Sequence, residues 1–177
     1  AQTHLQLMND LWQAIDRNEL RLLYQPKFHA PAGPVLGFEA LLRWQHPKQG
    51  LLSPDLFLPL AEKTGLIIPI GNWVIDEACR QLREWHLQGH TDWSMAVNLS
   101  TLQFEQPSLV KTVLDCLTRH SVPPGMLILE VTETTAMNNP DESVRVLTAL
   151  TDAGVKASID DFGTGYSSLL YLKRLPA

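Results

Sequence analysis

The stretch Leu127-Ile128-Leu129-Glu130-Val131-Thr132-Glu133 decides the fold class of this chain of 177 residues. A short apolar run of this kind is typical of a strand in a parallel sheet that helices cover on at least one face. Strands of the same character are predicted at residues 94–99 and 155–159, and segments with helical periodicity separate the three. Each repeat takes about 30 residues, which is the length of a βαβ crossover. The sequence therefore predicts an α/β fold.

The rest of the chain extends this alternation in both directions. Pro26 ends an early strand, Ser53-Pro54 begins a helix, and Asn139-Pro140-Asp141-Glu142 resembles a capping box at the start of another. The other predicted elements are helices at residues 5–15, 54–63, 72–87, 107–117 and 167–174 and strands at residues 22–25 and 35–42. About five strands fit either an open sheet or the front part of a closed (β/α)8 TIM-type barrel, and periodicity does not decide between them.

The composition limits the partners of the chain. It has 19 acidic and 14 basic residues, a formal charge of −5 and no basic block, so neither duplex nucleic acid nor a membrane surface is an expected partner. There is no run of 18 apolar residues and no signal-peptide pattern. Cys79 and Cys116 fall in helical patterns without metal-ligand spacing, which fits reduced thiols and a cytoplasmic location. Tethering of a longer protein to a membrane through other domains is compatible with these features.

Polar residues interrupt or end four of the five predicted strands. They are, in chain order, Glu39, Asn98, Glu130 with Glu133 three residues later, and Asp160-Asp161. A buried carboxylate costs several kcal/mol unless it is paired or binds a metal ion. The carboxyl ends of parallel strands lie on one face of the fold, where active sites are built. We therefore expect these side chains to converge there.

The types of these side chains predict the chemistry. Carboxylate and amide oxygens without His or Cys suit Mg²⁺, Mn²⁺ or Ca²⁺ better than Zn²⁺. Several carboxylates can hold two metal ions about 4 Å apart, an arrangement used in phosphate-ester hydrolysis. The structural alternatives are Glu39 pairing with Arg43, Asn98 capping the next turn, Glu130 and Glu133 as charges at a helix entry, and Asp160-Asp161 as turn chemistry. Recurrence at equivalent positions favours the metal site, and Arg43 is then a candidate phosphate clamp.

Five motifs in register resemble the EAL domain family. They are Tyr24-Gln25-Pro26, Gly37-Phe38-Glu39-Ala40-Leu41-Leu42-Arg43-Trp44, Val97-Asn98-Leu99-Ser100, Glu130-Val131-Thr132-Glu133 and Asp160-Asp161-Phe162-Gly163-Thr164-Gly165. Their order and spacing agree with the family across nearly the whole chain. The resemblance implies a (β/α)8-type barrel with one antiparallel strand. It also implies hydrolysis of the bacterial messenger cyclic di-GMP to linear pGpG with two Mg²⁺ or Mn²⁺ ions.

The resemblance further implies a role for each matching residue. The implied metal ligands are Glu39, Asn98, Glu130, Asp160 and, for the second metal, Asp161. The implied nucleotide contacts are Gln25, Leu41 and Arg43, with Arg43 on a phosphate. Glu133 is expected to hold the loop that shapes the metal site and the contact of a homodimer. Glu39, Glu133 and Asp161 are the expected catalytic residues, and a metal-activated hydroxide attacks one phosphodiester in line.

The family pattern continues beyond Leu175-Pro176 with a strand that bears a catalytic lysine, followed by a further Glu and a Gln. We therefore expect residues 1–177 to form a single EAL-type domain without its last three strands, and this piece alone to be inactive. Two alternatives stay open: a receptor that binds cyclic di-GMP without cleaving it, and a dimerisation or interaction module. The intact Glu39, Asn98, Glu130 and Asp160-Asp161 argue against the receptor.

Overall fold

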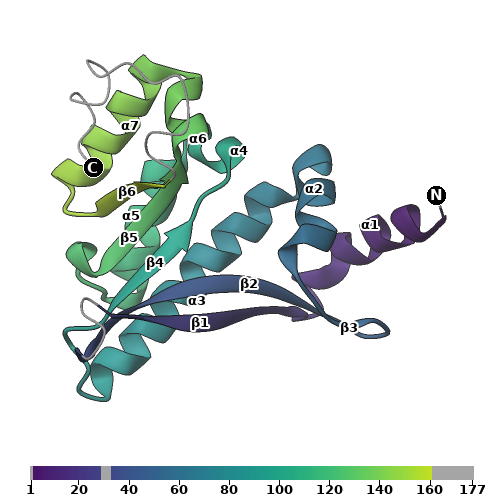
Figure 1. Cartoon of the computed structure of the whole chain (residues 1–177), viewed down its shortest axis with the longest axis horizontal. Helices are drawn as coiled ribbons and strands as arrows, with labels where there is room; N and C mark the ends of the chain where they lie inside the picture. The colour runs from purple at the N-terminus through teal and green to yellow at the C-terminus, as the bar shows by residue number, and fades with distance from the viewer. Residues whose placement is uncertain (1, 29–32, 161–177) are drawn as a thin grey trace.

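The computed structural model describes residues 2–28 and 33–160 of the chain (Figure 1). Its elements, in chain order, are α1 (Gln2–Ala14), β1 (Leu20–Phe28), β2 (Val35–His46), β3 (Gly50–Leu52), α2 (Pro54–Thr64), α3 (Ile67–Leu87), β4 (Ser94–Asn98), α4 (Thr101–Phe104), α5 (Leu109–His120), the 3-10 turn η1 (Pro124–Met126), β5 (Leu127–Thr132), α6 (Glu133–Asn138), α7 (Pro140–Asp152) and β6 (Lys156–Asp160). The helix predicted at residues 167–174 lies outside the described residues.

One mostly parallel sheet organises these elements. Its strand order is β1-β2-β4-β5-β6, and β3 pairs with β2 off this path. The pairs β2–β4, β4–β5 and β5–β6 are parallel, whereas β1 and β3 run antiparallel to β2. The predicted α/β fold with an antiparallel strand is therefore confirmed. The prediction of five strands missed β3, because three residues are too short to show a periodic pattern.

The first strand is longer than its sequence predicts. Pro26 does not end β1 but pairs with Phe38 of β2, and the strand continues to Phe28. A proline has no N–H to donate, so it is tolerated on a strand with no partner on its N–H side. Within the described sheet, β1 is such an edge strand. The extension matters for the site because it brings Lys27 onto the sheet.

Helices cover one face of the sheet. Helix α3 lies against β1 and β4, α7 lies against β6, and α5 contacts both α3 and α7 (Figure 1). The sheet residues that face them are apolar and buried: Ala40, Met95, Val97, Leu129 and Val131. Burying one side chain of valine or leucine size stabilises a fold by about 1.5–3 kcal/mol. Because successive side chains of a strand point to opposite faces, the residues between these buried ones lie on the face of the sheet opposite the helices.

Helix boundaries follow local signals. Pro54 is the first residue of α2 and Ser53 precedes it in extended conformation, as predicted. Asn139 caps α7, because its side-chain oxygen accepts the N–H of Glu142. Ser100 and Gln103 form a capping box around α4, which the sequence-based prediction missed. Among the helices of the described ranges, none combines the length and the apolar character that a membrane crossing requires.

A buried histidine fixes the N-terminal helix to the sheet. The Nδ1 atom of His46, at the end of β2, accepts the backbone N–H groups of Lys48 and Gln49 at 3.0 and 3.1 Å. Nδ1 therefore carries no proton, and Nε2 donates to Asp10 Oδ2 of α1 at 2.7 Å. This hydrogen bond joins α1 to β2 through two residues that are 36 positions apart in the sequence.

Candidate active site

The sheet register places the predicted site residues on the face opposite the helices. Glu39 is level with Gln25 on β1 and with Ala96 on β4. Asn98 follows Ala96 by two positions and is level with Glu130 on β5. Because side chains alternate along a strand, Gln25, Glu39, Asn98 and Glu130 share one face. The expected convergence of the interrupting residues is therefore found for these three strands.

Direct contacts join three of these residues to a lysine. The Nδ2 atom of Asn98 donates to Glu39 Oε2 at 3.1 Å. The Nζ atom of Lys27 lies 3.2 Å from Glu39 Oε1 and 3.5 Å from Glu130 Oε1. Residues 27, 39, 98 and 130 thus form one polar cluster across four strands, which we call the carboxylate cluster. The structural alternative that Glu39 pairs with Arg43 is not what the described residues show.

The burial of the two carboxylates differs. The side chain of Glu130 is 9% exposed and that of Glu39 is 25% exposed, whereas Lys27 is 44% exposed. Partial burial lowers the pKa of Lys27, but the carboxylates of Glu130 and Glu39 outweigh it and hold the pKa above its usual value. Lys27 therefore stays an ammonium at neutral pH and neutralises part of the charge of the carboxylate cluster.

The oxygen atoms of this cluster fit a hard divalent cation. Glu39 and Glu130 provide carboxylates, and Asn98, with its nitrogen turned to Glu39, provides its carbonyl oxygen. Among residues 2–28 and 33–160, no three His, Cys, Asp or Glu side chains come together as a metal site. The backbone of Asp160 pairs with Thr132 at the end of β6, two positions beyond the level of Glu130. Asp161 lies outside the described residues, so its predicted role stays a prediction.

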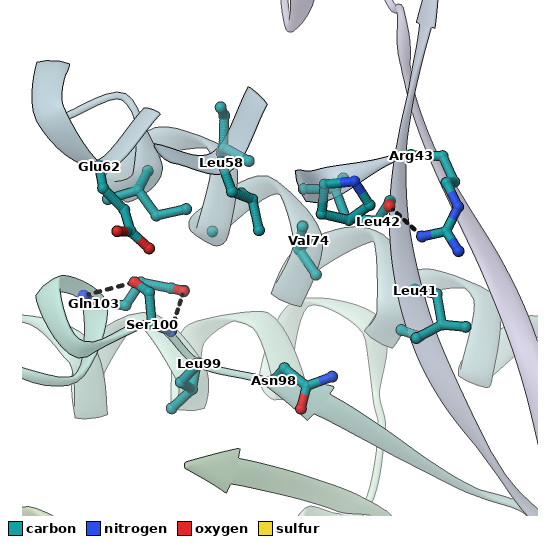
Figure 2. A pocket seen from close by; sticks show the side chains of 15 residues that line it. Leu41, Leu42, Arg43, Leu58, Glu62, Val74, Asn98, Leu99, Ser100 and Gln103 are labelled. Atoms are coloured by element: carbon teal, nitrogen blue, oxygen red, sulfur yellow. Dashed lines mark hydrogen bonds between the residues drawn. The ribbon is translucent and has the colours of Figure 1, made fainter. Parts of the chain in front are cut away.

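A cavity opens beside Asn98, between the carboxyl end of β4 and the middle of β2. It has a volume of about 260 Å³ and is closed on its other side by helices α2 and α3 (Figure 2). Its lining is mainly aliphatic: Leu41, Leu42, Leu58, Ile67, Ile70, Val74 and Leu99. Arg43, Glu62, Asn98, Ser100 and Gln103 add polar groups. An apolar cavity with a few polar groups at its margin is the usual form of a small-molecule site.

Two of the three predicted nucleotide contacts line this cavity. Leu41 and Arg43 follow Glu39 on the same face of β2, and both border the cavity (Figure 2). The Nη1 atom of Arg43 donates to the carbonyl of Leu42 at 2.7 Å, which leaves further guanidinium N–H groups as donors. Gln25 is exposed on β1, level with Glu39, and is not part of the cavity lining.

Glu133 occupies a distinct position. It is the first residue of α6 and is 3% exposed. The hydroxyl of Thr132 caps this helix by accepting the N–H of Thr135, and the hydroxyl of Thr135 lies 2.5 Å from that of Thr101. Glu133 is therefore placed by a helix start at the carboxyl end of β5, near the site but outside the carboxylate cluster. Its predicted role in holding a loop stays a prediction.

Sequence reasoning missed Lys27 and Gln103. Lys27 follows Gln25 by two residues, so the alternation of side chains along a strand puts both on one face. The sequence-based prediction ended this strand before Pro26 and therefore did not include Lys27. The S-x-x-Q spacing of Ser100 and Gln103 is a capping-box signal that directly follows Asn98. Gln103 accepts the N–H of Ser100 at 3.3 Å and so fixes the chain beside the site.

Comparison with known proteins gives consistent matches. The family model described as "EAL domain" matches residues 8–177. The bifunctional diguanylate cyclase/cyclic di-GMP phosphodiesterase MucR of Pseudomonas aeruginosa is 63% identical over 177 residues, which are 100% of this chain and 26% of that protein. The cyclic di-GMP phosphodiesterase NbdA of the same species is 46% identical over 176 residues, which are 99% of this chain and 22% of that protein. The chain thus spans about a quarter of the length of these curated relatives.

A solved structure agrees with the sequence matches. The PaMucR phosphodiesterase in complex with c-di-GMP superposes with a TM-score of 0.94 at 63% identity, over 97% of this chain and 70% of that chain.

Proposed function

The chain belongs to the EAL domain family, and from that premise we propose that it hydrolyses cyclic di-GMP to linear pGpG with two Mg²⁺ or Mn²⁺ ions. The TIM-barrel type of fold predicted from the sequence is confirmed by the family and its solved members. The observation that carries the proposal is the carboxylate cluster, in which Glu39, Asn98 and Glu130 gather from three different strands. Gathering partly buried carboxylates costs free energy, so packing alone does not explain why these groups lie together.

The proposal gives a metal-binding role to three residues of the carboxylate cluster and to Asp160 and Asp161. Glu39, Asn98 and Glu130, together with Asp160, would hold the first metal ion, and Asp161 would contribute to the second. When bound, such ions would activate a water molecule and would neutralise charge on the oxygens of the phosphodiester. The low exposure of Glu130 keeps its carboxylate in a region of reduced dielectric, where its attraction for a cation is stronger than in water.

The cavity orients the nucleotide. Its aliphatic walls suit the flat face of a nucleobase, and Arg43 at its margin suits a phosphate oxygen. Cavity and cluster share Asn98, so a base held in the cavity places the adjoining phosphodiester beside the metal ligands. Holding a substrate in this way lowers the entropic part of the reaction barrier. Gln25, on the far side of Glu39, provides a further contact to the nucleotide.

Three further parts of the proposal concern the whole protein. We propose that residues 1–177 belong to a single domain, which the family match over residues 8–177 supports. A cytoplasmic location is supported by the free thiols of Cys79 and Cys116. Homodimerisation remains a prediction, and light scattering of the purified protein tests it.

Turnover of cyclic di-GMP by the full protein, followed by chromatography of the product pGpG, tests the proposal. Wild-type protein with Mn²⁺ is expected to release pGpG, and chelation of the metal is expected to stop the reaction. Glu39→Gln removes one anionic ligand with little change in shape, so it is expected to abolish turnover while the circular dichroism spectrum stays unchanged. The matched control is Glu84→Gln, an exposed carboxylate on α3 that pairs with Arg80.

Two results would contradict the proposal in different ways. If Glu39→Gln keeps an intact fold and hydrolyses cyclic di-GMP at the wild-type rate, the carboxylate cluster takes no part in the reaction. Binding of cyclic di-GMP by the wild-type protein without turnover in Mg²⁺ or Mn²⁺ identifies a receptor instead of an enzyme.

A further inference from the structure

The carboxylate cluster contains a cation of its own. Lys27 reaches Glu39 at 3.2 Å and Glu130 at 3.5 Å, so one ammonium group bridges the carboxylates of two strands that are not neighbours. The five sequence motifs that resemble the family do not include Lys27. Its place in the cluster follows from β1 continuing past Pro26.

The contacts of Lys27 use the oxygen atoms that a metal ion needs. Glu39 and Glu130 each present Oε1 to the ammonium, and Glu130 is nearly buried. Two cations close to the same carboxylates repel each other, and each reduces the attraction that the other experiences. A divalent ion that binds Glu39 and Glu130 must therefore displace the ammonium or share its ligands with it.

The position of Lys27 allows such a displacement. It lies on the edge strand of the described sheet, and its side chain is 44% exposed. A lysine stem has four rotatable bonds, so the ammonium can turn to solvent without moving the backbone. Glu39 and Glu130, in contrast, are set on interior strands of the sheet.

We propose that Lys27 is an internal counter-ion that competes with divalent metal for Glu39 and Glu130, and so sets the metal affinity of the site. This inference rests on the proposed function, since it requires a metal site at the carboxylate cluster. In the absence of divalent metal the ammonium stabilises the two carboxylates, and metal binding releases it. Lys27 is a positioning residue in this account and takes no part in the chemical step.

Mn²⁺ titration of the full protein by calorimetry, with no nucleotide present, tests this inference. Lys27→Met keeps the length of the side chain and removes its charge. We expect this variant to bind Mn²⁺ about three- to tenfold more tightly than wild type, because the metal no longer displaces a cation. In EDTA its thermal midpoint is expected to fall, because two carboxylates lose their shared partner, and the rise in midpoint on adding Mn²⁺ is expected to exceed that of wild type.

The matched control is Lys156→Met. Lys156 on β6 is level with Ile128 and therefore lies on the same face of the sheet, but it forms no ion pair with any described residue. Its loss changes the net charge equally, so its Mn²⁺ affinity is expected to stay within twofold of wild type. If Lys156→Met binds Mn²⁺ as much more tightly than wild type as Lys27→Met does, the change in net charge alone explains the effect. That result would overturn the inference.

The other outcomes separate this inference from the proposed function. If wild type binds Mn²⁺ and Lys27→Met binds it equally or more weakly, Lys27 is not a competitor, and the proposed function stands. If Lys27→Met binds Mn²⁺ normally but cyclic di-GMP more weakly, Lys27 is a substrate contact and the inference is wrong. If wild type neither binds Mn²⁺ nor turns over cyclic di-GMP, the proposed function itself fails.

Discussion

Replacement of Gly71 by alanine is expected to destabilise the protein, although alanine is the better helix former. Gly71 is buried in α3, and a Cβ atom built there lies 2.2 Å from Cδ and Nε2 of Gln103 and 2.6 Å from its Oε1. Gln103 is itself 4% exposed and accepts the N–H of Ser100 at 3.3 Å. The added methyl group must therefore displace the amide end of the Gln103 side chain, which packs against α3.

The contacts give the expected size of the effect. Helix propensity alone favours alanine by about 1 kcal/mol. Against this, overpacking a buried site costs about 1–3 kcal/mol, and loss of the hydrogen bond at Ser100 costs about 0.5–1.5 kcal/mol. We therefore expect Gly71→Ala to lower the free energy of unfolding by about 2 kcal/mol. Because Ser100 adjoins Leu99 and Asn98, we also expect weaker Mn²⁺ binding.

Equilibrium urea unfolding of four proteins measures this: wild type, Gly71→Ala, Gln103→Ala and the double variant. In the Gln103→Ala background no side chain opposes the new methyl group, so Gly71→Ala should there stabilise by about 1 kcal/mol. The interaction energy between the two substitutions should then be about 3 kcal/mol. Equal stabilisation by Gly71→Ala in both backgrounds would refute the argument, because it would show that helix propensity alone decides.

Three other predictions concern binding, thiol reactivity and acid stability. Arg43→Ala is expected to weaken binding of cyclic di-GMP, measured by calorimetry, by about 1.5–3 kcal/mol, the range for a hydrogen bond to a charged group, and an unchanged affinity would exclude the phosphate contact. Burial raises the pKa of Cys79 to about 12 and that of Cys116 to about 11, so iodoacetamide at pH 8 should label native protein far more slowly than urea-unfolded protein; equal rates would contradict the buried positions. The hydrogen bond from His46 lowers the pKa of Asp10, so this carboxylate stabilises the fold above its unfolded pKa of about 3.9 and less as the pH falls through the folded value. Asp10→Asn should therefore lower the thermal midpoint at pH 7, with a difference from wild type that shrinks below about pH 4, and a pH-independent difference would show that the carboxylate charge is not the cause.

The sequence by itself determined the class of the fold and singled out most residues of the candidate site. Apolar strands such as residues 127–132 must be covered by helices, and this requirement is visible in a single stretch. A carboxylate within such a strand is costly unless it has a partner, so Glu39 and Glu130 stand out from the apolar residues around them in the sequence alone. The order and spacing of five motifs along the chain were also enough to show the resemblance to the EAL domain family.

Only the tertiary structure decided which groups share these carboxylates. The sequence suggests Arg43 as the partner of Glu39, because the two are only four positions apart, but the partners are Lys27 and Asn98, 12 and 59 positions away in the chain. Likewise, Gly71 and Gln103 belong to helices that meet only in the folded state. The periodicity of apolar residues indicates whether one residue is buried, whereas its partner on another strand depends on the register between the strands. That register is set by the packing of the whole sheet.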